Sequence, residues 1–329
     1  MSSSEIIARA EGLGFAYRPG EFAVRHLELE LRRGEVFGLL GRNGAGKTTT
    51  VRLLTTLLPP TEGRGELFGK DLRLCGRAER ARIGVVLQSE SLDFVSVERN
   101  LTLYAFLWGV PREVAKSRAE EMLELFELES NRKRKPWALS GGERRRFQVA
   151  RELMHDMDLL FLDEPTVGLD ALTRKRILGY LGRRARAGLS IVFTTHILHE
   201  ADELCDRIGI LRGGRLRAVG APADLKREFR GARFVEAELD RPVTEAEDRD
   251  LDALLAHRGP SYVEVARGPA RIEFQAPDAE GLVAELAGWA SARGIRLVRI
   301  SVREPTLEEA FVDLVSEGAS ELEAEEETP

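Results

Sequence analysis

The stretch GRNGAGKTT at residues 41–49 places glycines, a lysine and two threonines at the spacing of a loop that holds a phosphate chain. An apolar stretch precedes it and a helix-forming one follows, so backbone N–H groups and a helix N-terminus would point at the same phosphates. Glycine is needed because a Cβ would hold the backbone away from phosphate oxygens. Lys47 is placed to meet the β- and γ-phosphates, and Thr48 to offer its hydroxyl to Mg²⁺. The predicted nucleotide-binding residues are Gly41, Asn43, Gly44, Ala45, Gly46, Lys47, Thr48 and Thr49.

A carboxylate pair follows an apolar stretch in LLFLDEP at residues 159–165. A buried strand would deliver Asp163 to the carboxyl edge of a parallel sheet, where ligands bind in open α/β sheets. We expect Asp163 to hold Mg²⁺ and Glu164 to polarise the attacking water, and a positioned general base contributes roughly 10² to 10⁴ in rate. An isolated Asp-Glu pair is typical of a solvated loop. The apolar stretch and the phosphate loop favour the catalytic interpretation.

The string LSGGE at residues 139–143 predicts a second phosphate-binding surface. Ser140 is a natural helix N-cap, Gly141 and Gly142 leave the backbone bare, and the helix beginning near Glu143 presents its positive end. Alone, such a string is an ordinary capped turn. One chain cannot readily fold both surfaces around a single nucleotide, so we expect this one to meet ATP held by another copy of the chain.

Four single residues complete the candidate site. Gln88 follows an apolar strand and would place its carboxamide near Mg²⁺ and the lytic water, although a lone Gln there is usually a polar loop residue. His196 ends another strand and would bond the γ-phosphate, or serve only as a capping residue. Tyr17 would stack on adenine or pack in the core. Asp170 lies where a loop could sense the opposing subunit.

Composition limits the class of protein. The chain has 329 residues, 43% hydrophobic and 32% charged, with a net charge of -6, which disfavours a nucleic-acid partner. No apolar run approaches the roughly 18 to 20 residues of a membrane span, and the first ten residues lack an apolar signal core. We therefore expect a cytoplasmic protein. Its two cysteines, Cys75 and Cys205, form no C-x-x-C and are expected to be buried or incidental thiols.

The order of elements predicts an α/β fold in two parts. An antiparallel strand pair within residues 5–31 should lead into a parallel, doubly wound sheet, with helices over 48–58, 101–128 and 144–155. A second domain should follow with the order βαββαβ, the ferredoxin-like arrangement. The expected boundaries are 1–225 for an ATPase domain, with a helical subdomain at about 90–155, and 226–316 for an α+β domain. A short helix over 307–315 and a disordered acidic tail over 317–329 should complete the chain.

Taken together, residues 5–225 resemble the ATP-binding subunits of ABC transporters in motif order and spacing. The resemblance implies a P-loop ATPase that uses ATP and Mg²⁺. It also assigns roles by position: adenine stacking to Tyr17, the Walker A loop to 41–49, the Q-loop to Gln88, the signature to 139–143, the Walker B aspartate to Asp163, the catalytic glutamate to Glu164, the D-loop to Asp170 and the switch histidine to His196. The family's commonest signature ends in glutamine where this chain has Glu143, and we expect little change from that carboxylate.

Further stretches, among them THILHEADELCDRIGILRGGRL and REPTLEEAFVDLV, look like drug-export ATPases of the daunorubicin-resistance type. That resemblance implies a homodimer, or a pair with a paralogue, bound beneath a separate membrane permease, with a small regulatory domain after the ATPase. We expect residues 89–110 to dock the permease, with more than half of their named apolar side chains in the core instead. These side chains are Leu92, Phe94, Val97, Leu103, Tyr104, Phe106, Leu107 and Trp108. The alternative is a soluble ABC-type ATPase of translation or DNA repair. The transported molecule is not predicted.

Overall fold

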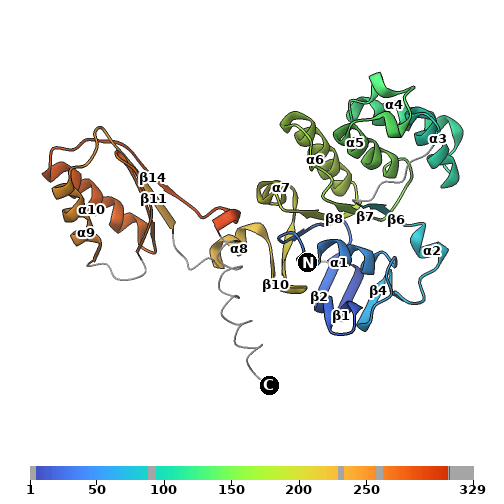
Figure 1. Ribbon diagram of the computed structural model, residues 1–329, viewed down its shortest axis with the longest axis horizontal. Helices are drawn as coiled ribbons and strands as arrows, with labels where there is room; N and C mark the ends of the chain where they lie inside the picture. The colour runs from blue at the N-terminus through green and yellow to red at the C-terminus, as the bar shows by residue number, and fades with distance from the viewer. Residues whose placement is uncertain (1–4, 88–93, 229–232, 257–261, 310, 312–329) are drawn as a thin grey trace. The chain divides into compact units, whose positions relative to one another are not determined.

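The computed structural model describes residues 5–87, 94–228, 233–256, 262–309 and 311 (Figure 1). The chain divides into two compact units, Met1–Pro222 and Ala223–Pro329.

The first unit is built on a six-stranded sheet with the order β10-β9-β3-β8-β7-β6. All neighbours are parallel except β9 and β10, which form an antiparallel hairpin. Every residue of β3, β7 and β8 is buried, as continuous apolar runs predict for strands covered on both faces. The bounds are β3 Val36–Leu40, β6 Ile83–Val86, β7 Leu159–Asp163, β8 Ser190–Thr195, β9 Arg207–Arg212 and β10 Arg215–Gly220.

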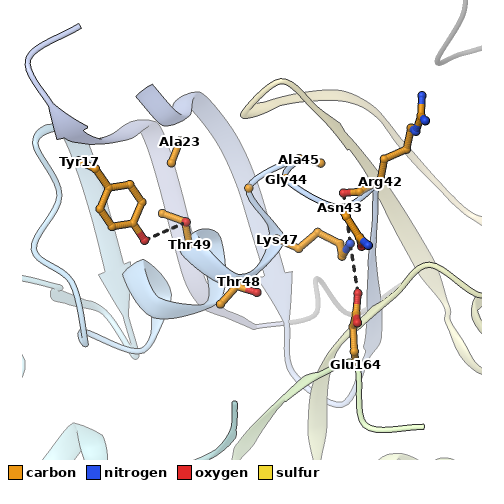
Figure 2. A pocket seen from close by; sticks show the side chains of 11 residues that line it. Tyr17, Ala23, Arg42, Asn43, Gly44, Ala45, Lys47, Thr48, Thr49 and Glu164 are labelled. Atoms are coloured by element: carbon orange, nitrogen blue, oxygen red, sulfur yellow. Dashed lines mark hydrogen bonds and ion pairs between the residues drawn. The ribbon is translucent and has the colours of Figure 1, made fainter. Parts of the chain in front are cut away.

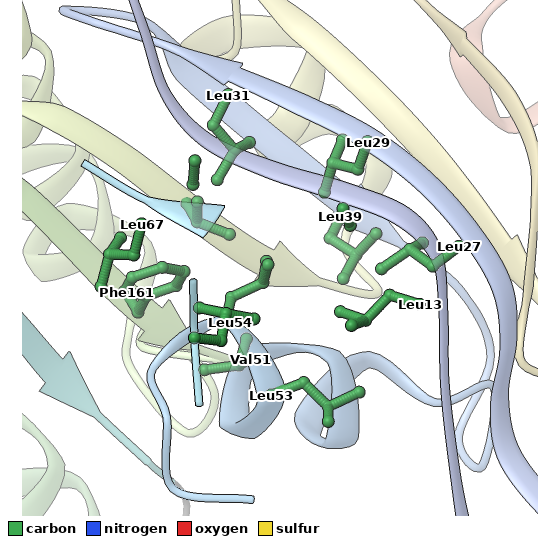
Figure 3. Packing of buried hydrophobic residues seen from close by; sticks show 14 of the residues in the cluster. Leu13, Leu27, Leu29, Leu31, Leu39, Val51, Leu53, Leu54, Leu67 and Phe161 are labelled. Carbon is green, nitrogen blue, oxygen red and sulfur yellow. The ribbon is translucent and has the colours of Figure 1, made fainter. Parts of the chain in front are cut away.

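An antiparallel sheet with the order β2-β1-β4-β5 forms the second layer of this unit. Its strands are β1 Ile6–Arg18, β2 Glu21–Arg32, β4 Glu62–Leu67 and β5 Lys70–Asp71. Alternate leucines of β2 join residues of helix α1, Lys47–Leu54, in one apolar core (Figure 3). The predicted helix over 48–58 is therefore too long. It ends at Leu54 because Thr56 takes a positive φ of 62° and turns the chain back.

The helical part of the unit contains α3 Val97–Leu107, α4 Arg112–Leu125 and α5 Gly141–Glu152, with short 3-10 turns at Glu129–Asn131 and Pro136–Ala138. The single helix predicted over 101–128 is wrong. Gly109, at φ 80°, and Pro111 interrupt it, because proline lacks the N–H that an uninterrupted helix needs. The third predicted helix begins three residues earlier than expected, at the glycines. The remaining helices of this unit are α2 Arg77–Arg80, α6 Ala171–Arg186 and α7 Leu198–Leu204.

The second unit contains the predicted βαββαβ order. Its four strands form an antiparallel sheet with the order β12-β13-β11-β14, and its core lies between that sheet and helices α9 and α10. The bounds are α8 Pro222–Glu228, β11 Arg233–Leu239, α9 Glu245–Ala256, β12 Val263–Arg267, β13 Arg271–Ala276, α10 Ala279–Ala292 and β14 Leu297–Arg303. Residues 307–309 and 311 are helical, and the rest of the helix predicted over 307–315 lies outside the described residues, as does the acidic tail.

Both cysteines are free and buried, as predicted. Burial raises the pKa of each thiol above its ordinary value. Cys205 packs tightly against β3, where a Cβ on Gly38 would lie 2.8 Å from its Sγ. Over the residues that the structure describes, no helix is long and apolar enough to cross a membrane.

Candidate functional site

Two of the predicted catalytic residues, Glu164 and His196, meet the phosphate loop where three neighbouring parallel strands end. Leu40 of β3 pairs with Thr195 of β8, and Asp163 of β7 pairs with Thr194 of β8. The phosphate loop continues from β3, Glu164 continues from β7, and His196 continues from β8. Sheet register therefore places three separate sequence motifs at one edge.

The loop itself has a fixed backbone. Gly46 has a φ of 104°, and a Cβ there would lie 2.4 Å from the carbonyl oxygen of Ala23, so only glycine fits. Lys47 Nζ donates to the carbonyl oxygen of Gly41 at 2.7 Å and lies 3.4 Å from that of Arg42. The loop lines a cavity of about 450 Å³, a size typical of small-ligand sites. Its lining residues are Tyr17, Ala23, Arg42, Asn43, Gly44, Ala45, Gly46, Lys47, Thr48, Thr49 and Glu164.

Asp163 and Thr48 place two oxygen atoms that could bind a metal ion beside this loop. Thr48 Oγ1 donates to Asp163 Oδ2 at 2.7 Å, and Thr194 Oγ1 donates to Asp163 Oδ1 at 2.6 Å. Asp163 is fully buried. Hydroxyl and carboxylate oxygens are the ligands that Mg²⁺ prefers. These two side chains thus have the chemistry and the proximity that a magnesium site needs.

Glu164 occupies the centre of the site. Its Oε1 lies 3.4 Å from Lys47 Nζ (Figure 2). The same oxygen lies 3.3 Å from His196 Nδ1. Its backbone takes a positive φ of 52°, and its N–H donates to the carbonyl oxygen of Thr194 at 3.1 Å and to the hydroxyl of the same residue at 3.0 Å. Positive φ is uncommon for a non-glycine residue and is frequent at active sites. The side chain is only 12% exposed, so its carboxylate faces the cavity rather than bulk water.

The predicted signature begins helix α5 but lies away from this cavity. Ser140 is the N-cap and accepts a hydrogen bond from the backbone N–H of Glu143, whose Oε2 accepts one from the backbone N–H of Ser140 at 2.7 Å. Asn131 donates to the other carboxylate oxygen at 2.9 Å. These hydrogen bonds, that from the Ser140 N–H above all, lower the pKa of Glu143 to about 2. The carboxylate thus caps its own helix, and Ser140, Gly141 and Gly142 are absent from the cavity lining.

Three predicted residues have mixed outcomes. Tyr17 is 57% exposed and lines the cavity next to Thr49, so the core-packing alternative is wrong. Asp170 is the N-cap of α6, where it accepts hydrogen bonds from the N–H groups of Leu172 and Thr173, a local role that sequence alone did not predict. Gln88 lies outside the described residues.

Several site residues were not predicted. Ala23 lines the cavity, but nothing in its residue type marks it, and Arg42 lines it from within the predicted loop without having been named as a binding residue. Glu200 is fully buried and accepts hydrogen bonds from the hydroxyls of Thr166 at 2.8 Å and Thr195 at 3.1 Å. It thereby joins the loop after Glu164 to the strand end before His196.

The side chains expected to dock the permease are mostly exposed, although more than half of them were expected in the core. Of the eight, Leu92 lies outside the described residues, Val97 is buried and Tyr104 is half-buried. The other five are exposed, namely Phe94, Leu103, Phe106, Leu107 and Trp108. The core under α3 is already filled by Val97, Leu101 and Ala105. Three of these exposed side chains, Phe94, Leu103 and Leu107, border a cavity of about 320 Å³ that Val95, Asn100, Tyr104 and Arg151 also line. We refer to Phe94, Leu103, Phe106, Leu107 and Trp108 as the α3 patch.

Residues 24–167 match the family model described as ABC transporter. The linearmycin resistance ATP-binding protein of Bacillus subtilis is 33% identical over 311 residues, which cover 93% of this chain and 97% of the relative. This chain belongs to the ABC transporter ATP-binding family. The doxorubicin resistance ATP-binding protein of Mycobacterium tuberculosis is 34% identical over 98% of this chain and 97% of its own length. The fold of the first unit is that of the ABC ATPases.

Solved structures agree with this assignment. An ATP-binding cassette solved as a dimer in a post-hydrolysis state with ADP and phosphate is 27% identical, with a TM-score of 0.60, over 65% of this chain and 98% of its own. An ATP-binding subunit of an ABC transporter has a TM-score of 0.63 at 27% identity and covers 68% of this chain and 93% of its own. The predictions of an ABC-type ATPase and of a drug-export type of subunit are confirmed, and the alternative of a translation or repair ATPase is not supported.

Proposed function

We propose that this chain powers export of a small or lipid-like molecule through a separate membrane permease. Two copies would face each other, so that each ATP is held by one copy's phosphate loop and by the other copy's Ser140 helix end. The observation that supports this is the composition of the cavity. Loop residues and Glu164 line it, and none of Ser140, Gly141 and Gly142 does. A nucleotide bound in this cavity would therefore leave the Ser140 helix end available to ATP that another copy of the chain holds.

Within such a dimer, the chemistry would depend on groups already in place. Lys47 would bind the β- and γ-phosphates, and Tyr17, exposed at the other end of the cavity, would stack on adenine. Bound Mg²⁺, held by Thr48 and Asp163, would neutralise charge on the transferred phosphate. Glu164 would orient and deprotonate the attacking water, while His196 Nδ1 contacts the same carboxylate oxygen, Oε1, that Lys47 approaches. Loss of the γ-phosphate would remove the contact to Ser140 and reopen the dimer.

The permease would dock on the α3 patch, which would place this chain at the inner face of the cell membrane. Contiguous exposed apolar side chains commonly mark a protein interface. Helix α3 is joined to α5, because the hydroxyl of Tyr104 donates to the carboxylate of Glu152 at 2.8 Å. A movement of the permease against α3 would thus reach the helix that begins at Ser140.

We propose an ATPase domain over 1–225, with a helical subdomain over 90–155, and a regulatory or dimerisation domain over 226–316. What supports the last assignment is that the second unit has its own core, formed by β11, β13, α9 and α10, and so does not depend on the ATPase sheet for its fold. Comparing the dimerisation of the full chain with that of residues 1–225 would test it.

A mixing experiment tests the facing arrangement. Lys47→Ala should fail to bind ATP, and Ser140→Arg should bind ATP but present no signature, so neither variant should dimerise alone. A mixed pair contains one complete site, made from the loop of the Ser140→Arg copy and the signature of the Lys47→Ala copy. We expect ATP-dependent dimers to reappear only in the mixture, as measured by light scattering with Glu164→Gln added to both chains to stop turnover. Absence of mixed dimers would show that both contacts come from one polypeptide.

A further inference from the structure

Arg145 lies in the second turn of α5, five residues after Ser140, and its guanidinium spans two strand ends. Its Nη1 donates to the backbone carbonyl of Leu87 at 2.7 Å, and its Nη2 donates to the backbone carbonyl of Asp163. Strands β6 and β7 are parallel neighbours, with Val86 paired to Leu162, so these carbonyls end adjacent strands. A planar guanidinium with several donors suits two acceptors held in this way.

The contact with Asp163 fixes the peptide plane between the two catalytic carboxylates. The carbonyl of that peptide accepts from Arg145, and its N–H, which belongs to Glu164, donates to Thr194. The carbonyl and the N–H of this peptide group are therefore both hydrogen-bonded. The positive φ of Glu164 makes this orientation costly, so the flanking hydrogen bonds are what keep it.

The second contact reaches the residue immediately before Gln88. Because the carbonyl of Leu87 accepts from Arg145, the end of β6 and the start of α5 are tied together. The guanidinium is itself held by the amide oxygen of Gln148, a buried residue less than one turn further along α5, at 3.1 Å. Hydrogen bonds from a charged donor are about twice as strong as neutral ones.

From this arrangement we infer that Arg145 is a positioning residue that couples a subunit's own ATP site to the Ser140 helix end that the same subunit presents to its partner's ATP. The inference rests on the proposed facing dimer. Arg145 touches no nucleotide in this scheme. It acts through Asp163 and Leu87 on one side and through the orientation of α5 on the other. Binding at one site would then align the signature for the second, which is positive cooperativity between two ATP molecules.

The test compares Arg145→Met with Arg146→Met, a neighbour that forms its ion pair with Glu127, at 3.4 Å, and not with a strand end. In a Glu164→Gln background, we expect Arg145→Met to raise the ATP concentration for half-maximal dimerisation about tenfold, within the range typical of coupling between sites. With Glu164 intact, the Hill coefficient for ATP hydrolysis should fall from near 2 toward about 1. Arg146→Met should leave both quantities unchanged.

Affinity for ADP separates positioning from general damage, because ADP lacks the γ-phosphate that the partner's signature would bind. Arg145→Met should bind fluorescent ADP within about twofold of the parent, since the loop contacts of Lys47 remain. Arg145→Lys keeps the charge but loses the planar two-nitrogen geometry, and it should lower the Hill coefficient even if the methionine variant misfolds. Unchanged cooperativity in folded Arg145→Lys and Arg145→Met chains would refute the inference and leave the proposed dimer intact. Failure of the Glu164→Gln parent to dimerise would refute the proposed function, and with it this coupling.

Discussion

Replacing Glu164 with glutamine should separate nucleotide binding from hydrolysis. The amide has the same shape and can keep the φ of 52° and both backbone hydrogen bonds to Thr194, but it is not a base. Loss of a positioned general base typically costs about 10² to 10⁴ in rate. At about 1.36 kcal/mol per factor of ten, the barrier should rise by roughly 3 to 5 kcal/mol. Lys47 keeps its contacts with two loop carbonyls, so the Kd for ATP should change by no more than about threefold.

The assay is steady-state phosphate release beside a fluorescent-ATP titration and light scattering. Glu113→Gln is the matched control, because that side chain is 83% exposed on α4 and far in sequence from every site motif, and it should hydrolyse ATP at the parent rate. Turnover by Glu164→Gln within tenfold of the parent would remove the carboxylate from the role of base. Lost ATP binding would instead mean that its contact with Lys47 organises the loop.

Three further substitutions follow from the geometry. Gly46→Ala should weaken ADP binding about 100-fold in a folded chain, because its Cβ would approach the Ala23 carbonyl oxygen to 2.4 Å at φ 104°; fluorescent-ADP titration and circular dichroism measure this. Glu143→Gln should destabilise the fold at pH 7. The pKa of Glu143 is lowered from 4.5 to about 2, so its stabilising effect is present above pH 4.5 and is lost as the pH falls toward 2. In urea unfolding, the difference in the free energy of unfolding between variant and parent should be smaller at pH 3 than at pH 7. Glu200→Ala breaks an ion pair between the buried Glu200 carboxylate and Arg174 Nε, at 3.1 Å, and should lower the free energy of unfolding by about 3 kcal/mol, read from the urea midpoint.

Each of these has an outcome that would contradict its reasoning. Wild-type ADP affinity in Gly46→Ala would mean that the loop does not keep its left-handed turn in solution. If the free energies of unfolding of Glu143→Gln and its parent differ by the same amount at both pH values, the N–H of Ser140 does not stabilise the charged form of Glu143. A Glu200→Ala chain as stable as the parent would mean that its hydroxyl partners are satisfied in another way.

Motifs with fixed spacing could be predicted from sequence because their chemistry is local. The loop around Lys47 needs glycine at positions that the string itself shows, and Asp163 ends a strand whose other four residues are all apolar. The βαββαβ order of elements along the second unit was predictable for the same reason, because apolar patterns and turn residues mark each element locally. Helix ends were less predictable, because Leu54 and Gly109 end or interrupt helices through backbone turns that an apolar pattern does not specify.

The sequence did not predict contacts made by residues that belong to no recognisable motif. Arg145 is one arginine in a run of three, and only the folded chain shows which of them reaches Asp163 and Leu87. Ala23 lies on an outer strand and approaches the loop only through the packing of the antiparallel sheet. The exposure of Phe106 was also misjudged, because the apolar content of α3 exceeds what the core beneath it can hold.

The two buried thiols make this chain convenient for spectroscopy. A maleimide reacts with a thiolate, and neither native cysteine forms one readily, since burial opposes ionisation at both. A cysteine introduced at an exposed position of α4 would therefore take up a dye selectively without removal of the native residues. Energy transfer between two labelled copies would then follow opening and closing in real time.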